Sequence, residues 1–366
     1  MDATLLTRRD FWDDETPALP GDPRLAGHVL FETSGSSGVP KQVALSKSAL
    51  QVSAAAVNRH LGVTAESCWG LALPTRHVGG FGVAARAFEA GCRFHQFESR
   101  WDAETFANWL EENEVTHTSL VPTQVHDLVA SGRIAPESLK AIVVGGGHLD
   151  RQTGQRAREL GWPVLASYGM TEAGSQIATQ EPADLGSPYE PAPIPLLPIW
   201  DARVGEDGAL SISGPALFSG YVVGGIFTPR AADWHTTSDR AELAGRGLTP
   251  LGRLDSLVKV LGELVDPEAI EREMVLLSAG RLSPLDLAVA ALPDERTEHR
   301  LVPVFLSSVD PQTAAFLLAD YNAQAPGFRR LTKPVFLSSI ARSQIGKPLR
   351  SAIAQIVLLE DRKYAK

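Results

Sequence analysis

Residues 33–41 are Thr33-Ser34-Gly35-Ser36-Ser37-Gly38-Val39-Pro40-Lys41. They follow a short apolar run, residues 28–31, that predicts a β-strand. This stretch could bind a polyphosphate. Its glycines let the backbone N–H groups approach the phosphates, its hydroxyl groups donate hydrogen bonds, and its lysine supplies a positive charge. A Walker A loop would place glycine directly before the lysine and Ser or Thr directly after it, where this chain has Pro40 and Gln42. The stretch therefore predicts a phosphate-binding loop of another kind, and its alternative is a Ser/Gly-rich surface loop.

Length and composition indicate an ordinary globular protein of about two domains. The chain has 366 residues, of which 44% are hydrophobic and 21% charged, which is typical of folded domains. The formal net charge of −9 argues against non-specific nucleic-acid binding, but ATP needs only a local positive site. Cys68 and Cys92 lack metal-ligand spacing, and neither a membrane span nor an apolar leader is evident. We therefore expect a cytoplasmic protein without a nucleic-acid partner.

Strand and helix patterns alternate along the first half of the chain. Strands are expected at 69–73, 91–97, 116–121, 139–144 and 164–166, separated by helical patterns. The first helix is expected over residues 47–61, with Ser46 as its N-cap. Such alternation predicts a mainly parallel sheet, whose ligand loops gather at the carboxyl ends of the strands. We expect four loops at such ends, at residues 33–41, 74–80, 145–147 and 167–172.

The second half of the chain has a different pattern. Residues 181–198 are rich in proline and predict a connector without regular structure. Short strands and turns from 202 to 251 predict a β-rich subdomain, and a change of composition at residues 252–255 predicts a domain boundary. We therefore expect an α/β protein with a large N-terminal lobe over residues 1–252, its β-rich subdomain at about 200–251, and a small α+β domain over residues 253–366.

Five further stretches occur in the order found in the adenylate-forming superfamily of acyl-CoA synthetases, peptide-synthetase adenylation domains and luciferases. They are Ser167-Tyr168-Gly169-Met170-Thr171-Glu172, Gly214-Pro215 with Gly220-Tyr221, Thr237-Ser238-Asp239, Gly252-Arg253-Leu254-Asp255-Ser256-Leu257-Val258-Lys259 with Gly262, Val265, Pro267 and Glu271, and Gly346-Lys347. One match is weak, but five in order over residues 30–350 closely resemble the superfamily. Two positions depart from the family pattern. Ser238 stands where the family's T-G-D motif has glycine, and Gly147-His148 stands where a small residue usually follows the paired glycines. Only 32 residues precede Thr33, so we expect part of the usual N-terminal lobe to be missing.

Within the superfamily the chain most resembles the o-succinylbenzoate–CoA ligases of menaquinone (vitamin K2) synthesis, in their short bacterial form. Residues 74–80 and 171–176 and the compact size carry this resemblance. It implies an AMP-forming acid–thiol ligase that uses ATP and Mg²⁺ to make an acyl adenylate, and then passes the acyl group to coenzyme A. Adenylation gives a poor electrophile a good leaving group. Another aryl or acyl acid, or a carrier-protein thiol as acceptor, is the alternative. A more remote alternative is a non-catalytic nucleotide-binding module. For the oligomeric state, a homodimer is left open.

The resemblance also implies which residues hold ATP and magnesium. Those that would surround ATP are Thr33, Ser34, Gly35, Ser36, Ser37, Gly38, Lys41, Gly145, Gly146, Tyr168, Gly169, Thr171, Asp239 and Arg253. Tyr168 would stack on adenine, and Asp239 with Arg253 would bind the ribose. Glu172 would hold Mg²⁺, and Lys347 would neutralise the charge that develops between the acid and the α-phosphate. Each of these residues could instead have a purely structural role: core packing for Tyr168, a carboxylate at a helix N-terminus for Glu172, and a solvated surface side chain for Lys347.

The remaining expected site residues concern the acid and coenzyme A. His77 would orient or gate the acid, and Arg76 would face the second carboxylate of a diacid. The other acyl-site residues implied are Gly169, Ser175 and Gln176, and those for coenzyme A are Lys259 and Gly262. Asp255 would be the hinge about which a mobile C-terminal domain brings Lys347 inward for adenylation. The domain would then rotate to admit coenzyme A.

Overall fold

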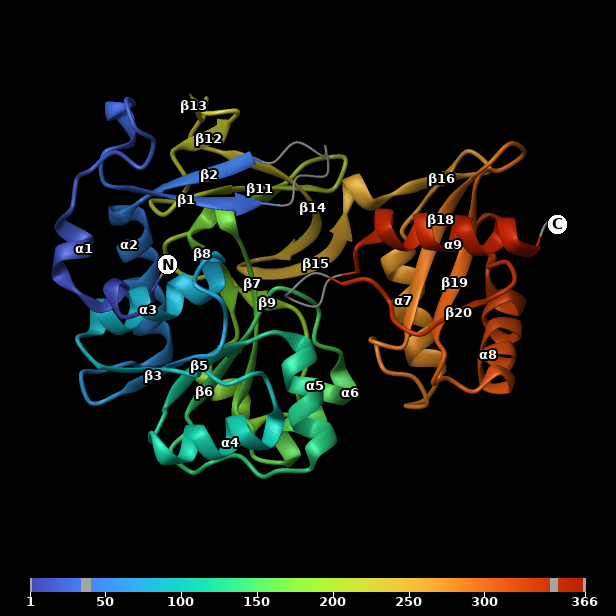
Figure 1. The fold of residues 1–366 in the computed structure, drawn as a ribbon, viewed down its shortest axis with the longest axis horizontal. Helices are drawn as coiled ribbons and strands as arrows, with labels where there is room; N and C mark the ends of the chain where they lie inside the picture. The colour runs from blue at the N-terminus through green and yellow to red at the C-terminus, as the bar shows by residue number, and fades with distance from the viewer. Residues whose placement is uncertain (1, 34–40, 343–347, 365–366) are drawn as a thin grey trace. The chain divides into compact units, whose positions relative to one another are not determined.

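The structure is a computed structural model that describes residues 2–33, 41–342 and 348–364. Clustering of contacts divides the chain into two compact units (Figure 1). The large unit comprises residues up to 237 together with residues 241–250, and the small unit comprises residues 238–240 and those from 251 onward. Each unit has hydrophobic core residues of its own, so each is described by itself.

A six-stranded sheet forms the centre of the large unit and confirms the predicted, mainly parallel sheet. Its strands, in spatial order, are β4 (Arg93–Gln96), β3 (Cys68–Leu71), β5 (His117–Leu120), β6 (Ala141–Val144), β7 (Val164–Met170) and β8 (Ser175–Thr179). The first five are parallel, and β8 is antiparallel to β7. Strands β3, β5, β6 and β8 are buried along their whole length, which explains the apolar sequences of β3 and β6.

The direction of the strand order changes between β3 and β5. The chain passes from β3 to β4 one way and from β4 to β5 the other, so right-handed connections place their helices on opposite faces. Figure 1 shows α3 beside α2 and, apart from them, the group α4, α5 and α6. These helices are α2 (Lys47–Leu61), α3 (Val78–Ala90), α4 (Ala103–Glu112), α5 (Pro122–Ser131) and α6 (Arg151–Glu159). In an open parallel sheet, ligands bind at such a reversal, outside the carboxyl ends of the strands.

Two further sheets of the large unit are mostly antiparallel. One contains β1 (His28–Thr33), β2 (Lys41–Ser46), β12 (Gly220–Val223) and β13 (Ile226–Pro229). The other contains β10 (Asp201–Val204), β11 (Ala209–Ser213), β14 (His235–Ala244), β15 (Gly247–Arg253) and β9 (Ile194–Pro195). The predicted β-rich region contains β10 to β15, of which β12 and β13 belong to the first sheet. Strands β14 and β15 each contain residues of both units.

Two local predictions were wrong. Strand β1 confirms the strand predicted before Thr33, but it is not in the parallel sheet, because it pairs antiparallel with β2, with Thr33 opposite Lys41. The second neighbour of β2 is β12, from residues 220–223, a pairing that local pattern cannot reveal. Residues 181–198 are not wholly irregular, since they contain a 3₁₀ turn (Pro182–Gly186) and β9. Strand β9 lies at a sheet edge, where proline costs little.

The predicted first helix is confirmed. The hydroxyl of Ser46 accepts a hydrogen bond of 3.1 Å from the backbone N–H of Ala49 and so caps α2. Before this helix, η1 (Leu5–Thr7), α1 (Arg9–Asp13) and η2 (Pro23–Leu25) lead into β1. The side chain of Trp12 is buried against α3, where its ring stacks on Phe88 at a centroid distance of 5.2 Å. The N-terminal segment is thus part of the core of the large unit.

The small unit places helices on both faces of a three-stranded sheet. Its strands are β18 (Leu287–Asp294), β19 (Glu298–Leu306) and β20 (Val335–Leu337), and its helices are α7 (Pro267–Leu277), α8 (Pro311–Gln324) and α9 (Arg350–Tyr364). Leu287 and Val289 pack with residues of α7 and α8, whereas Ala288 and Ala290 pack with residues of α9. This alternation follows from the two-residue period of a strand. A hairpin of β16 (Val258–Val260) and β17 (Glu263–Val265) precedes α7.

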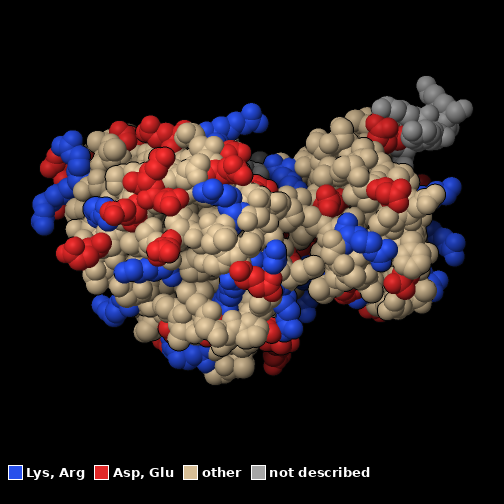
Figure 2. All heavy atoms as spheres, turned by 90° about the horizontal axis from the view of Figure 1, so that it is seen from below, with Lys and Arg blue, Asp and Glu red and all other residues tan. Residues whose placement is uncertain are grey.

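Acidic and basic side chains are interspersed on the face shown in Figure 2. Both signs occur on each unit, in keeping with 34 Lys and Arg against 43 Asp and Glu in the sequence. Among the helices that the structure describes, none combines the length and the apolar character needed to cross a bilayer.

The burial of Trp12 predicts the contribution of the N-terminal segment to stability. Its indole N–H donates a 2.7 Å hydrogen bond to the carbonyl of Leu6. Trp12→Ala should lower the free energy of unfolding of the large unit by about 3–5 kcal/mol, the usual cost of removing a large buried ring. Urea titration followed by tryptophan fluorescence measures this, because all seven tryptophans lie between residues 12 and 234, in the large unit.

Leu5→Ala is the matched control, because Leu5 is 44% exposed in the same segment. It should change the free energy of unfolding by less than about 0.5 kcal/mol. Equal effects of the two substitutions would contradict the assignment of Trp12 to the core.

Candidate active site

A tight turn between β7 and β8 brings together most of the residues predicted around the α-phosphate and the acid. Strand β7 ends at Met170, a 3₁₀ turn covers Thr171–Ala173, and β8 begins at Ser175. The pairing shifts register at Gly169. A Cβ atom on Gly169 would lie 1.8 Å from the carbonyl oxygen of Ser175, so only glycine permits this approach. The expected residues on the turn are Tyr168, Gly169, Thr171, Glu172, Ser175 and Gln176.

The carboxylate of Glu172 is fixed by a tyrosine. The hydroxyl of Tyr221 donates a 3.0 Å hydrogen bond to Oε1 of Glu172. The ammonium group of Lys41 lies 4.2 Å from the centre of the Tyr221 ring, within the range of a cation–π contact. Lys41 and Glu172, both predicted to meet phosphate or magnesium, therefore contact the same side chain. Tyr221 was noticed in the sequence only as part of a motif, without a role.

Several predicted residues cannot be placed. Ser34, Gly35, Ser36, Ser37, Gly38 and Lys347 lie outside the residues that the structure describes. Their flanking residues are described, and Thr33 pairs directly with Lys41 across β1 and β2. On either side of residues 343–347, Arg342 and Pro348 form an antiparallel bridge. The predicted roles of the undescribed residues stay predictions.

Arg86 is a candidate functional residue that the sequence reasoning missed. It lies on α3 with 2% of its surface exposed. Its guanidinium donates to the hydroxyl of Ser119 at 3.2 Å and to that of Ser175 at 3.1 Å, and it lies 5.3 Å from the ring centre of Trp69. Among the described residues no carboxylate forms an ion pair with it.

The charge of Arg86 is thus buried without an opposite charge. Burial lowers the pKa of this guanidinium to about 9, because a low-dielectric environment disfavours the charged form. Two neutral hydroxyls satisfy some of its N–H groups but do not cancel the charge. Ser119 is in β5, at the strand-order reversal, and Ser175 begins β8. The position therefore suits recognition of an anionic group of a ligand. In the sequence, the signal was a single arginine within a mostly apolar helix.

The loop after β3 holds two other predicted residues. Arg76 is exposed, whereas His77 is half-buried at the N-cap of α3. The backbone N–H of His77 donates 3.1 Å to the carbonyl of Pro74. A Cβ atom on Gly80 would lie 2.4 Å from that same carbonyl, so glycine is required for the tight turn. The structure thus places His77 at a fixed backbone position next to the reversal and leaves Arg76 at the surface.

Gln176 supplies a second buried polar group. It is 4% exposed, and its Nε2 donates 3.1 Å to the hydroxyl of Ser167. Its Oε1 has no hydrogen-bond partner among the described residues. Buried amide oxygens are normally paired, so this atom is a candidate acceptor for a ligand donor.

The residues predicted around adenine come from neighbouring strands. Gly145 and Gly146 directly follow β6, and Tyr168 lies half-buried on β7. The two strands are paired, with Val144 opposite Ala166. The backbone N–H of Gly145 donates 3.1 Å to the carbonyl of Leu120. The geometry keeps these three predicted residues at one end of adjacent strands.

The predicted ribose pair and the predicted hinge residue meet in the small unit. Arg253 bonds to Asp255 through Nε at 2.7 Å and Nη2 at 2.5 Å, and its Nη1 lies 3.2 Å from Asp239. The bonds from Arg253 lower the pKa of Asp255. Lys259 is exposed on β16, and Gly262 lies in the turn to β17. One arginine thus joins a ribose candidate to the hinge candidate.

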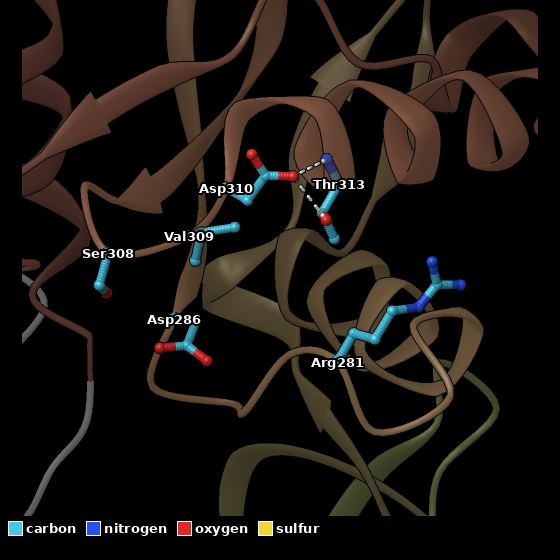
Figure 3. Close-up of a pocket in the computed structure, with 6 residues that line it drawn as sticks. All are labelled: Arg281, Asp286, Ser308, Val309, Asp310 and Thr313. Atoms are coloured by element: carbon cyan, nitrogen blue, oxygen red, sulfur yellow. Dashed lines mark hydrogen bonds between the residues drawn. The ribbon is translucent and has the colours of Figure 1, made fainter.

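Two hollows lie on the described surface. One, of about 390 Å³, belongs to the small unit and is lined by Arg281, Asp286, Ser308, Val309, Asp310 and Thr313. In Figure 3 the carboxylate of Asp310 faces Thr313 and accepts two 2.9 Å bonds, so it caps α8. None of these residues was predicted for the site. The other, of about 370 Å³, is lined by residues 217–219 and 230–233 of the large unit.

If magnesium binds here, the structure favours Glu172 acting with substrate phosphates and water over a site made wholly of protein ligands. Within the described ranges no group of three or more His, Cys, Asp or Glu side chains is arranged to hold a metal. Mg²⁺ is commonly held by one or two carboxylates together with substrate phosphates and water. Oε2 of Glu172 has no hydrogen bond to another described residue, so it is a suitable oxygen ligand.

The chain is similar in sequence to a known ligase. The 2-succinylbenzoate–CoA ligase of Escherichia coli strain K12 is 31% identical over 277 residues, which are 74% of this chain and 57% of that enzyme. The chain therefore spans little more than half the length of that curated relative.

Two solved structures have a similar fold. The o-succinylbenzoate coenzyme A synthetase (MenE) of Bacillus subtilis, in complex with ATP and magnesium ion, is 26% identical with a TM-score of 0.73, over 88% of this chain and 69% of that one. The same enzyme in complex with the acyl-adenylate intermediate OSB-AMP gives 26% identity and a TM-score of 0.72, over 88% and 68%. The profile of the AMP-binding enzyme family matches residues 19–222, which is more than half of the chain, and the chain belongs to that family.

Proposed function

We propose that the chain is an AMP-forming ligase that activates a carboxylic acid with ATP and Mg²⁺ and then transfers the acyl group to coenzyme A. A carboxylate oxygen attacks the α-phosphorus and pyrophosphate leaves. The thiolate of coenzyme A then attacks the acyl carbon and AMP leaves. The observation that carries this proposal is the turn between β7 and β8. It places Glu172 and Lys41 against the same tyrosine, Tyr221, and it places Ser175 in contact with Arg86.

The residues of this turn provide electrostatic stabilisation. The reaction brings two anions together, so catalysis depends on positioning and on neutralising charge. Glu172 would hold Mg²⁺ against the phosphates, and magnesium would supply Lewis-acid stabilisation of the phosphoryl oxygens. Thr171 would donate to the α-phosphate, and Lys41 would contact phosphate oxygens. Lys347, by its place in the Gly346-Lys347 motif, would neutralise the charge formed on attack.

We further propose o-succinylbenzoate as the acid. This compound has two carboxylates, of which only one reacts, so a recognition site for the second needs a cation. Arg86 offers a buried guanidinium with two serine hydroxyls beside it. A ligand carboxylate there would supply the missing opposite charge and a bidentate partner. The B. subtilis relative was solved with OSB-AMP, which supports the same acid class. Arg76, exposed at the surface, is the weaker candidate for this contact.

A panel of acids tests the function. With ATP, Mg²⁺ and coenzyme A, o-succinylbenzoate should give the fastest release of AMP and a coenzyme A thioester. Lys347→Ala should slow acid-dependent exchange of labelled pyrophosphate into ATP by about 100-fold or more, since a main charge stabiliser is lost. If another acid gave faster release of AMP, that acid would replace o-succinylbenzoate as the proposed substrate. If only a carrier-protein thiol accepted the acyl group, that thiol would replace coenzyme A as the proposed acceptor. Absence of exchange with every acid would overturn the function.

Arg86→Met tests recognition of the second carboxylate. The volume is roughly kept and the charge is lost, so kcat/KM for o-succinylbenzoate should fall roughly 100-fold. The rates with benzoylpropionate and butanoylbenzoate, which each lack one carboxylate, should change less than threefold. The Tm should be unchanged or raised, because an uncompensated buried charge costs stability.

Arg76→Ala is the control for Arg86→Met. It removes an exposed arginine from the loop before α3 and should leave kcat/KM for the diacid within about threefold. If Arg76→Ala lost the diacid selectivity and Arg86→Met kept it, the assignment would pass to Arg76.

A further inference from the structure

Tyr221 contacts both charged groups of the candidate phosphate site. Its hydroxyl donates to Oε1 of Glu172 at 3.0 Å, and its ring face lies 4.2 Å from the ammonium nitrogen of Lys41. These three residues come from the turn after β7, from β12 and from β2, which are far apart in the sequence. One side chain thus links three segments of the large unit.

The sheet register explains how Lys41 reaches the ring. Strands β2 and β12 are antiparallel neighbours (Figure 1), with Lys41 opposite Val223 and Val43 opposite Tyr221. Residues two apart on a strand share a face, so Lys41 and Tyr221 are diagonal neighbours on one face of the sheet. Long side chains at such diagonal positions come into contact.

The segment before Tyr221 also holds the backbone of Glu172. The backbone N–H of Phe218 donates 2.8 Å to the carbonyl of Glu172. The buried ring of Phe218 lies 4.7 Å from that of Tyr221, centre to centre. Residues 218–221 therefore fix both the main chain and the side chain of Glu172.

The hydrogen bond leaves the charge of Glu172 available. The donor of this hydrogen bond is a phenol hydroxyl, which is a neutral group. A neutral donor restricts the carboxylate without cancelling its charge, unlike a salt bridge. Within the described part of the chain, Oε2 of Glu172 has no hydrogen-bond partner. One oxygen is thus held, and the other is available to a cation.

We propose that Tyr221 is a positioning residue that orients Glu172 toward a divalent cation and keeps Lys41 beside the same phosphates. This inference rests on the proposed function, because it takes Mg²⁺ and ATP as the ligands. Tyr221 acts through Glu172 and Lys41. Its ring and its hydroxyl serve different partners, so they can be tested separately.

Tyr221→Phe removes the hydroxyl and keeps the ring. We expect the Mg²⁺ concentration for half-maximal acid-dependent AMP release to rise roughly tenfold, the effect of losing a hydrogen bond to a charged group. At saturating Mg²⁺, kcat should stay within about twofold, and Tm should change little. Tyr221→Leu also removes the ring face, so it should in addition raise the KM for ATP, through Lys41.

Tyr189→Phe is the matched control, because its hydroxyl donates 3.4 Å to the carbonyl of Leu149, away from Glu172. The Mg²⁺ dependence should be unchanged in that variant. In a Glu172→Gln background, Tyr221→Phe should have no further effect on Mg²⁺ dependence. An unchanged Mg²⁺ requirement in Tyr221→Phe, or an equal shift in Tyr189→Phe, would overturn the proposal.

Calorimetric titration of ATP with and without Mg²⁺ separates this proposal from the proposed function, since it needs no turnover. Wild type should bind ATP more tightly with Mg²⁺, and Tyr221→Phe should lose most of that gain. If this holds while no acid supports AMP release, the proposed function fails and the role of Tyr221 stands. If Mg²⁺ gives wild type no gain, or gives the variant the same gain, the role of Tyr221 fails.

Discussion

The candidate site depends on the close approach of two backbones at Gly169 and Ser175. No side chain fits on Gly169, and the strand pairing shifts register there. The turn that results carries Glu172 toward Tyr221 and Lys41, and Ser175 toward Arg86. The residues proposed to bind metal and phosphate and those proposed to bind the acid are thereby set only a few residues apart on one turn. A reaction between a carboxylate and the α-phosphate of ATP requires that the two groups be held close together.

The polar side chains proposed to bind the acid are exceptions to the pairing of buried polar groups. Arg86 has no opposite charge, and Oε1 of Gln176 has no hydrogen-bond partner among the described residues. Both arrangements are unfavourable in an empty site. Residues that lower stability in this way are expected where a ligand supplies the missing partner. The surrounding buried strands and α3 hold them in place.

Much of this arrangement could be predicted from the sequence, because its signals are local. Strand-and-helix alternation predicted the parallel sheet, and Ser46 predicted the start of α2. The strand β2 and its pairing with β12 could not be predicted, since strand pairing depends on distant residues. Arg86 was missed because it lies in a helix whose other residues are mostly apolar and matches no motif. Tyr221 was quoted as part of a motif, but its contact with Glu172 joins positions 49 residues apart.

The account centres on attack of a carboxylate oxygen on the α-phosphorus of ATP. Isotope transfer measures that step directly, with o-succinylbenzoate whose carboxylates are labelled with ¹⁸O as the acid and mass spectrometry of the nucleotide and phosphate products. The account predicts one ¹⁸O atom in AMP for each coenzyme A thioester formed, and none in pyrophosphate. Label in inorganic phosphate with formation of ADP, or unlabelled AMP, would contradict it.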